Sequence, residues 1–131
     1  MTYQEAEAFF HEKRKQGRCG ENPGTFPYGP NYYDDFFIEL EITLDFIREE
    51  KVNYIDVVDK YTALLEDQTV DLGPIWASAG KRLKDGSTHL NWDSLIEIRD
   101  GNHRVAAYKK VGRKKIKAIM PQSHYEIWRS C

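Results

Sequence analysis

Two periods in the hydrophobic pattern predict most of the elements of this chain. From residue 54 to residue 66 apolar side chains recur every three or four positions, which is typical of a helix with one buried face. From Phe37 to Ile42 apolar residues alternate with polar ones, which is typical of a strand. The spacing of Phe37, Leu40, Leu44 and Ile47 also fits one face of a helix, so the pattern alone leaves both interpretations of this segment open.

A strand–turn–helix–strand unit is predicted between residues 94 and 121. The β-prone run 95–98 precedes Asp100-Gly101, which favours a turn because glycine adopts backbone angles that other residues resist. Three-residue apolar spacing from Val105 to Val111 then predicts a helix that Gly112 ends. Alternation over residues 115–120 predicts a second strand, which Pro121 stops.

The remaining elements are shorter. Thr2 and Glu5 have the spacing of a capping box, which predicts an N-terminal helix that ends near Gly17. Residues 74–77 predict a short strand that begins at a proline, and residues 78–92 a polar hairpin or excursion with Asp85-Gly86 as a candidate turn. The apolar residues between His124 and Trp128 are expected to dock on the core.

Residues 18–31 contain three glycines and three prolines and predict a long loop. Its aromatic residues, together with those just after it, have two interpretations. They either pin an N-terminal extension to the body of the protein or stack on a nucleobase, and we favour the first. These residues are Phe26, Tyr28, Tyr32 and Tyr33.

The length indicates one domain of 131 residues, and the predicted helices and strands place it in the α+β class. Within it, residues 1–35 form the N-terminal helix and loop, and residues 36–131 form the main globular unit. A net charge of −2 gives no overall signal for nucleic acid. Two cysteines are too few for a disulfide scaffold, neither has metal-ligand partners at zinc spacing, and no apolar run is long enough to span a membrane. We therefore expect a cytoplasmic protein with no protein-held metal.

The turn before the second predicted helix is the strongest candidate site. The first N–H groups of a helix lack partners within the helix and, with its dipole, favour an anion such as phosphate. His103 and Arg104 lie on this first turn, and arginine has donors suited to phosphate. Asn102 is expected to be the N-cap, and Asp100 either orients His103, binds a metal or caps the turn.

The run from Ile98 to Tyr108, Ile-Arg-Asp-Gly-Asn-His-Arg-Val-Ala-Ala-Tyr, resembles the motif of the ParB N-terminal/sulfiredoxin-like superfamily. The resemblance covers residues 38–121 and implies a small mixed sheet with two or three core helices. It favours a strand over 37–42, followed by a turn or short helix through Ile47. It implies a nucleotide ligand, ATP or CTP, accompanied by Mg²⁺. The phosphate-binding candidates that follow from it are Gly101, Asn102, His103, Arg104 and Lys60, the last an ordinary surface lysine in the alternative interpretation.

The resemblance also implies phosphotransfer or nucleotide hydrolysis with a carboxylate base. Glu39 and Glu41 are the acidic residues on the first predicted strand, and we take Glu41, with Asp100 and His103, as the catalytic candidates. Sulfiredoxin activity is not expected, because that branch has a catalytic cysteine where this chain has Asn102. The DNA-reading domain of the ParB branch is not expected either, because the chain ends ten residues after Pro121.

The alternative function is a non-catalytic module that binds protein or nucleic acid. A basic cluster between Lys109 and Lys117 is suited to a nucleic-acid backbone. The same lysines on a strand edge also discourage edge pairing, so a solvated edge is the simpler interpretation.

Overall fold

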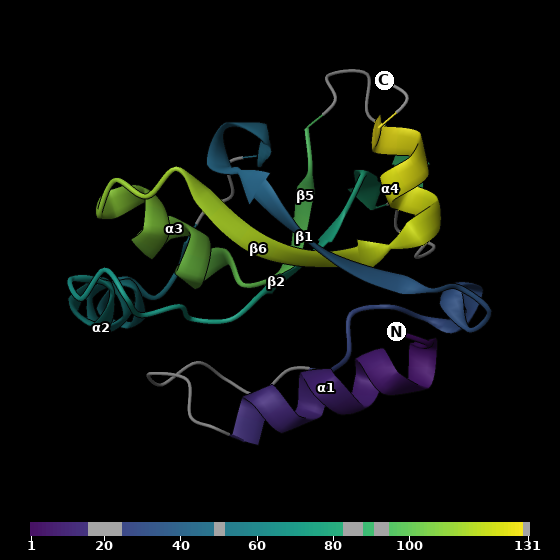
Figure 1. Ribbon diagram of the computed structural model, residues 1–131, viewed down its shortest axis with the longest axis horizontal. Coiled ribbons are helices and arrows are strands. Elements are labelled where there is room, and N and C mark those ends of the chain that lie inside the picture. Colours follow the sequence, from purple (N-terminus) through teal and green to yellow (C-terminus); the bar gives the residue numbers. More distant parts are fainter. Residues whose placement is uncertain (16–24, 49–51, 83–87, 91–94, 130–131) are drawn as a thin grey trace.

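A computed structural model describes residues 1–15, 25–48, 52–82, 88–90 and 95–129. It has the α+β class predicted from the sequence, with a four-stranded mixed sheet and an N-terminal helix (Figure 1). The described helices and short 3-10 turns are α1 (Tyr3–Lys15), η1 (Pro30–Tyr32), η2 (Leu44–Phe46), α2 (Ile55–Leu65), α3 (Asn102–Lys110) and α4 (Gln122–Arg129). The described strands are β1 (Phe37–Thr43), β2 (Ile75–Ser78), β3 (Gly80–Arg82), β4 (Thr88–Leu90), β5 (Glu97–Asp100) and β6 (Lys115–Pro121).

The main sheet has the strand order β1-β6-β2-β5. Strand β6 pairs antiparallel with β1, from Phe37 opposite Pro121 to Thr43 opposite Lys115, and parallel with β2 on its other side. The strand interpretation of residues 37–42 is thus confirmed. Strands β3 and β4 form the predicted antiparallel hairpin, whose Asp85-Gly86 turn lies outside the described residues.

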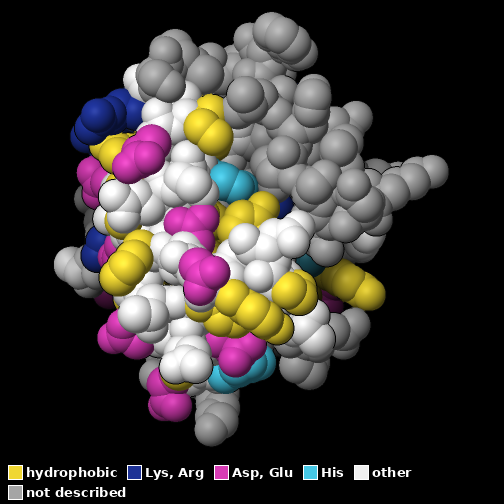
Figure 2. Space-filling model, turned by 90° about the vertical axis from the view of Figure 1, so that its right-hand side faces the viewer, with side chains coloured by type: hydrophobic (Ala, Val, Ile, Leu, Met, Phe, Trp, Pro, Cys, Tyr) yellow, Lys and Arg dark blue, Asp and Glu magenta, His cyan; other side chains and the backbone are white. Residues whose placement is uncertain are grey.

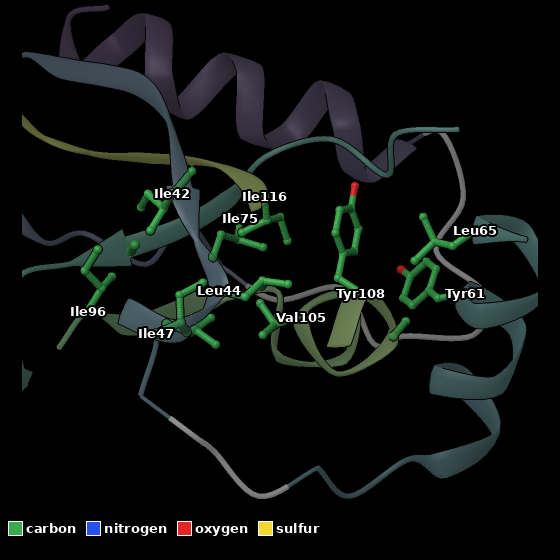
Figure 3. Close-up of a cluster of buried hydrophobic side chains, with 14 of the residues drawn as sticks. Ile42, Leu44, Ile47, Tyr61, Leu65, Ile75, Ile96, Val105, Tyr108 and Ile116 are labelled. Carbon is green, nitrogen blue, oxygen red and sulfur yellow. The ribbon is translucent and has the colours of Figure 1, made fainter. Parts of the chain in front are cut away.

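Two hydrophobic cores lie on the two faces of the sheet. One is built with α2, α3 and η2, and Figure 3 shows its side chains converging between these elements and the sheet. The other lies beneath α1, where Phe10, Phe37, Trp76 and Ile119 are almost fully buried. Each such side chain contributes roughly 2 kcal/mol through removal from water. The sheet that carries the β5–α3 junction is therefore supported by packed side chains on both faces.

Local sequence signals set the helix boundaries. The Thr2–Glu5 capping box is confirmed, since the Glu5 N–H donates to the Thr2 hydroxyl and the Thr2 N–H to the Glu5 carboxylate, at 3.2 and 3.0 Å. Gly112 has a φ of +80° after α3, as expected of a residue that ends a helix. At and just after the end of α2, the Arg113 guanidinium donates to the backbone carbonyls of Leu65, Asp67 and Val70.

The aromatic segment before β1 packs on the body of the protein, as predicted. Tyr28 and Tyr32 are buried in the core beneath α1, and Phe26 packs against it. The Arg99 guanidinium lies 4.8 Å from the Tyr28 ring centre and donates to the Pro27 carbonyl at 3.0 Å. Tyr33, unlike Tyr28 and Tyr32, is not buried, since 59% of its surface is exposed. Base stacking by Tyr28 or Tyr32 is therefore excluded by their burial.

The C-terminal residues dock on the core as helix α4, as expected from their apolar spacing. Tyr125 and Trp128 pack against the α2–α3 side of the sheet, and the Trp128 ring meets Phe46 with centres 5.9 Å apart. His124 is buried, and its Nδ1 accepts a hydrogen bond from the Ala79 N–H at 3.4 Å. Burial, and then the charge of Arg99, lower the pKa of His124 to about 4, although Asp35 opposes the shift.

Acidification is expected to destabilise the protein through His124. Because its pKa in the folded state lies below the ordinary 6.5, the unfolded chain binds more protons between about pH 6.5 and pH 4. The contribution of neutral His124 is complete above this window and falls by about 2 kcal/mol on going from pH 7.5 to pH 5. Urea denaturation at the two pH values measures the loss, and His124→Gln should reduce it. An equal loss in the variant would contradict this role.

In the described part of the chain, none of the helices combines the length and apolar character that a membrane span requires.

Candidate nucleotide site at the β5–α3 junction

Gly101 makes the sharp connection from β5 to α3. Its φ of +114° lies in the left-handed region that glycine tolerates, as the predicted turn requires. A Cβ at this position would lie 2.6 Å from Ile75 Cγ2 and 3.0 Å from Arg104 Nη2. The Val105 N–H donates to the Gly101 carbonyl at 3.0 Å, so the helix starts directly after the turn. Glycine is required here for both backbone conformation and space.

The expectation that Asn102 caps the helix is wrong. Gly101 occupies the N-cap position, and Asn102 is the first helical residue. The side chain of Asn102 instead lines a pocket, where its buried Oδ1 has no hydrogen-bond partner among the described residues. A buried oxygen of this kind favours an incoming donor, because an unpaired acceptor is costly.

Arg104 points into the protein. Its Nη1 donates to the Pro74 carbonyl at 2.8 Å, and its Nη2 donates to Asp100 Oδ2 at 3.0 Å. The exposed fractions of the two side chains are 7% for Arg104 and 17% for Asp100. Contrary to the sequence-based expectation, this guanidinium is oriented toward its own backbone and Asp100 rather than toward a ligand. It ties the start of β2 to the β5–α3 turn.

His103 is half-buried and lies against Tyr54, which precedes α2. The two ring centres are 5.7 Å apart and the planes are inclined by 32°. This contact brings the first turn of α3 beside the start of α2. His103 therefore lies at the β5–α3 junction, and the carboxylate of Asp100 pairs with Arg104.

Two candidates lie away from this junction. Glu41 is on the outer strand β1, exposed, with its carboxylate 3.7 Å from Lys115 Nζ. Strands β6 and β2 separate it from β5, which corresponds to roughly 14 Å across the sheet. Lys60 is exposed on α2, outside the lining of the pocket. The structure therefore groups residues 100–104 but brings neither Glu41 nor Lys60 to the pocket beside them.

The pocket has a volume of about 270 Å³ and is lined by residues of α3, by Ile98 of β5 and by Arg48 and Val52 from the segment between η2 and α2. Basic and amide groups line part of it, and aliphatic groups line the rest. Its lining residues are Arg48, Val52, Ile98, Asn102, Val105, Ala106 and Lys109. Sequence reasoning missed Arg48 and the site role of Lys109. Helical spacing from Asn102 to Ala106 and Lys109 was a usable signal for the latter, whereas Arg48 reaches the pocket only through tertiary structure.

A protein-held metal site is not formed here. Among the described residues, no three acidic, histidine or cysteine side chains gather as ligands, and the carboxylate of Asp100 pairs with Arg104. The residues therefore do not fit a protein cage for Mg²⁺. An ion of this type usually keeps waters and enters on the phosphates of a nucleotide, so we assign no step to it.

Four of the six basic residues between positions 109 and 117 have partners within the protein. Lys110 pairs with Asp59 at 2.8 Å, Lys117 with Asp71 at 3.2 Å, and Lys115 with Glu41. Arg113 donates to three backbone carbonyls at and just after the end of α2. A continuous track for a nucleic-acid backbone is therefore less favoured than the sequence suggested.

Comparison with protein-family models, with curated proteins and with solved structures gave no significant match. The function inferred for this chain accordingly depends on its own motif and on the geometry of the β5–α3 junction.

Proposed function

We propose that this protein binds a nucleotide, ATP or CTP, in the pocket beside the first turn of α3. The single observation that supports this most is the mixed lining of the pocket. Arg48 and Lys109 supply positive charge, while Val52, Ile98 and Ala106 supply apolar surface. Such a combination suits a ligand that is anionic at one end and flat and largely apolar at the other.

The first turn of α3 is a second feature that favours an anionic ligand. The N-terminal end of a helix carries partial positive charge, and Gly101 has no side chain with which to cap it. The buried Oδ1 of Asn102 is suited to accept from a ligand hydroxyl or amino group. The pocket is close to the lower end of the range for small-molecule sites, about 300 Å³, so part of a nucleotide would extend into solvent.

Binding is the core of the proposal, and phosphotransfer or hydrolysis would require a base near the phosphates. Of the three catalytic candidates, His103 is next to Asn102 in the chain, but it packs against Tyr54 and is not among the residues that line the pocket. Asp100 is engaged by Arg104, and Glu41 lies on the far strand of the sheet. We therefore assign no reaction.

The test is a calorimetric titration of the protein with ATP and with CTP in the presence of Mg²⁺. Lys109→Ala should weaken binding at least about tenfold, because it removes a charged contact worth about 1.5–3 kcal/mol. Lys60→Ala is the matched control, since Lys60 is an exposed lysine outside the pocket. The nucleotide affinity of the Lys60→Ala variant should stay within about twofold of that of the unmodified protein.

Absence of saturable binding by the unmodified protein would refute the proposal. Equal weakening by the two lysine variants would show that general charge, not the pocket, attracts the nucleotide.

A further inference from the structure

A second hollow adjoins the nucleotide pocket at the other end of α3. It has a volume of about 480 Å³ and lies between η2, Leu95 and the α3–β6 connection. Lys109 lines both hollows, so they are neighbours along one helix. We call this second hollow the α3–η2 groove; it is lined by Thr43, Leu44, Asp45, Ile47, Leu95, Lys109, Gly112, Arg113 and Lys114.

The groove has an aliphatic floor. Leu44 and Ile47 are buried and Leu95 is half-buried. Figure 3 shows Leu44 and Ile47 beside Val105 of α3, where they belong to the main core. The floor is therefore held firmly by residues whose other sides are packed inside the protein.

The rim of the groove is basic. Lys109, Arg113 and Lys114 contribute three positive charges, against the single negative charge of Asp45. This local excess contrasts with the net charge of −2 of the whole chain. The opposite side of the molecule, with α4 and the start of α1, shows acidic and hydrophobic side chains over much of its described surface (Figure 2). The groove therefore carries a local excess of positive charge.

The basic residues of the rim differ from the other lysines of the cluster. Lys110, Lys115 and Lys117 each pair with a carboxylate, and all three lie outside the groove lining. Arg113 is fixed in place by its three backbone carbonyl contacts and by the Tyr108 ring, 5.5 Å away. The rim therefore combines a rigid cation with the exposed lysines 109 and 114.

We propose that the α3–η2 groove binds a short acidic peptide segment with an aliphatic anchor residue. The aliphatic floor complements a leucine-like side chain, and the basic rim complements carboxylates on either side of it. A single-stranded nucleic acid fits less well, because the described residues that line the groove include no aromatic ring on which a base would stack. The inference goes beyond nucleotide binding, and Lys114 separates the two because it lines only the groove.

The probe for this site is a short fluorescein-labelled peptide with a central leucine flanked by aspartates, followed by fluorescence anisotropy. Lys114→Glu should weaken its binding at least about tenfold, because a repulsive charge replaces an attractive one. Lys60→Glu makes the same charge change outside the groove and should change affinity less than about threefold. Replacing the leucine of the peptide by serine should also weaken binding, through loss of the floor contact.

The proposal is overturned if the unmodified protein gives no saturable binding, or if the two glutamate variants weaken it equally. Tighter binding of a labelled oligothymidine would assign the groove to nucleic acid and also overturn it. Titration of Lys114→Glu with ATP and CTP keeps the two sites apart: unchanged nucleotide binding with weakened peptide binding is the expected result.

Discussion

Replacing Gly101 with alanine is expected to destabilise the protein by about 3 kcal/mol or more. The φ of +114° strains any residue with a Cβ, at a cost of about 1–3 kcal/mol. The new methyl group would also lie 2.6 Å from Ile75 Cγ2, on a side chain with no exposed surface, so the core must shift. Urea denaturation at neutral pH measures the change.

Gly112→Ala is the matched control for this effect. Gly112 also has a positive φ, of +80°, but a Cβ there would meet nothing within 4 Å. Its substitution should cost only the backbone strain, about 1 kcal/mol. Equal losses in the two variants would show that the contact with Ile75 does not constrain the turn.

Replacing Arg104 with alanine is expected to cost about 3 kcal/mol of folding stability. The substitution leaves the largely buried carboxylate of Asp100 without this arginine, and it removes the bond to the Pro74 carbonyl. Arg104→Lys should retain little of the lost folding stability, because one ammonium group does not reproduce the planar guanidinium that reaches both acceptors. Thermal and urea denaturation would measure these losses.

Lys110→Ala provides the comparison, since its pair with Asp59 is 56% exposed on both sides and should contribute about 0.5 kcal/mol or less. Adding Asp100→Ala to Arg104→Ala should recover part of the loss, because the largely buried carboxylate that Arg104 neutralises is then gone. If Arg104→Ala were as stable as Lys110→Ala, the internal role of Arg104 would be refuted.

Much of the fold follows from local signals in the sequence. Some signals predict structure only within a few residues of their own position. Examples are the Thr2–Glu5 capping box, the alternation in residues 37–42 and the glycine at position 112. The helix after Gly101 was also predictable, although its start was not. Asn102 is a good N-cap in isolation, but the left-handed turn at Gly101 moves the helix start back by one residue.

The site was less predictable because its side chains are oriented by distant parts of the chain. The sequence indicated a phosphate role for Arg104, yet the acceptor that orients its Nη1 is the carbonyl of Pro74, 30 residues away. Arg48 reaches the pocket because its backbone N–H bonds to the Ile96 carbonyl beside β5. Glu41 was placed on the correct strand, but the strand order puts that strand at the opposite edge of the sheet.

The most direct test of nucleotide binding beside α3 is to follow the backbone amides by NMR during titration with ATP or CTP. The nucleotide proposal predicts the largest saturable shifts at Asn102, Ala106 and Lys109, with Arg48 also affected and the outer strand β1 unchanged. It is contradicted if millimolar nucleotide leaves these amides unmoved, or if the saturable shifts cluster on another face of the molecule.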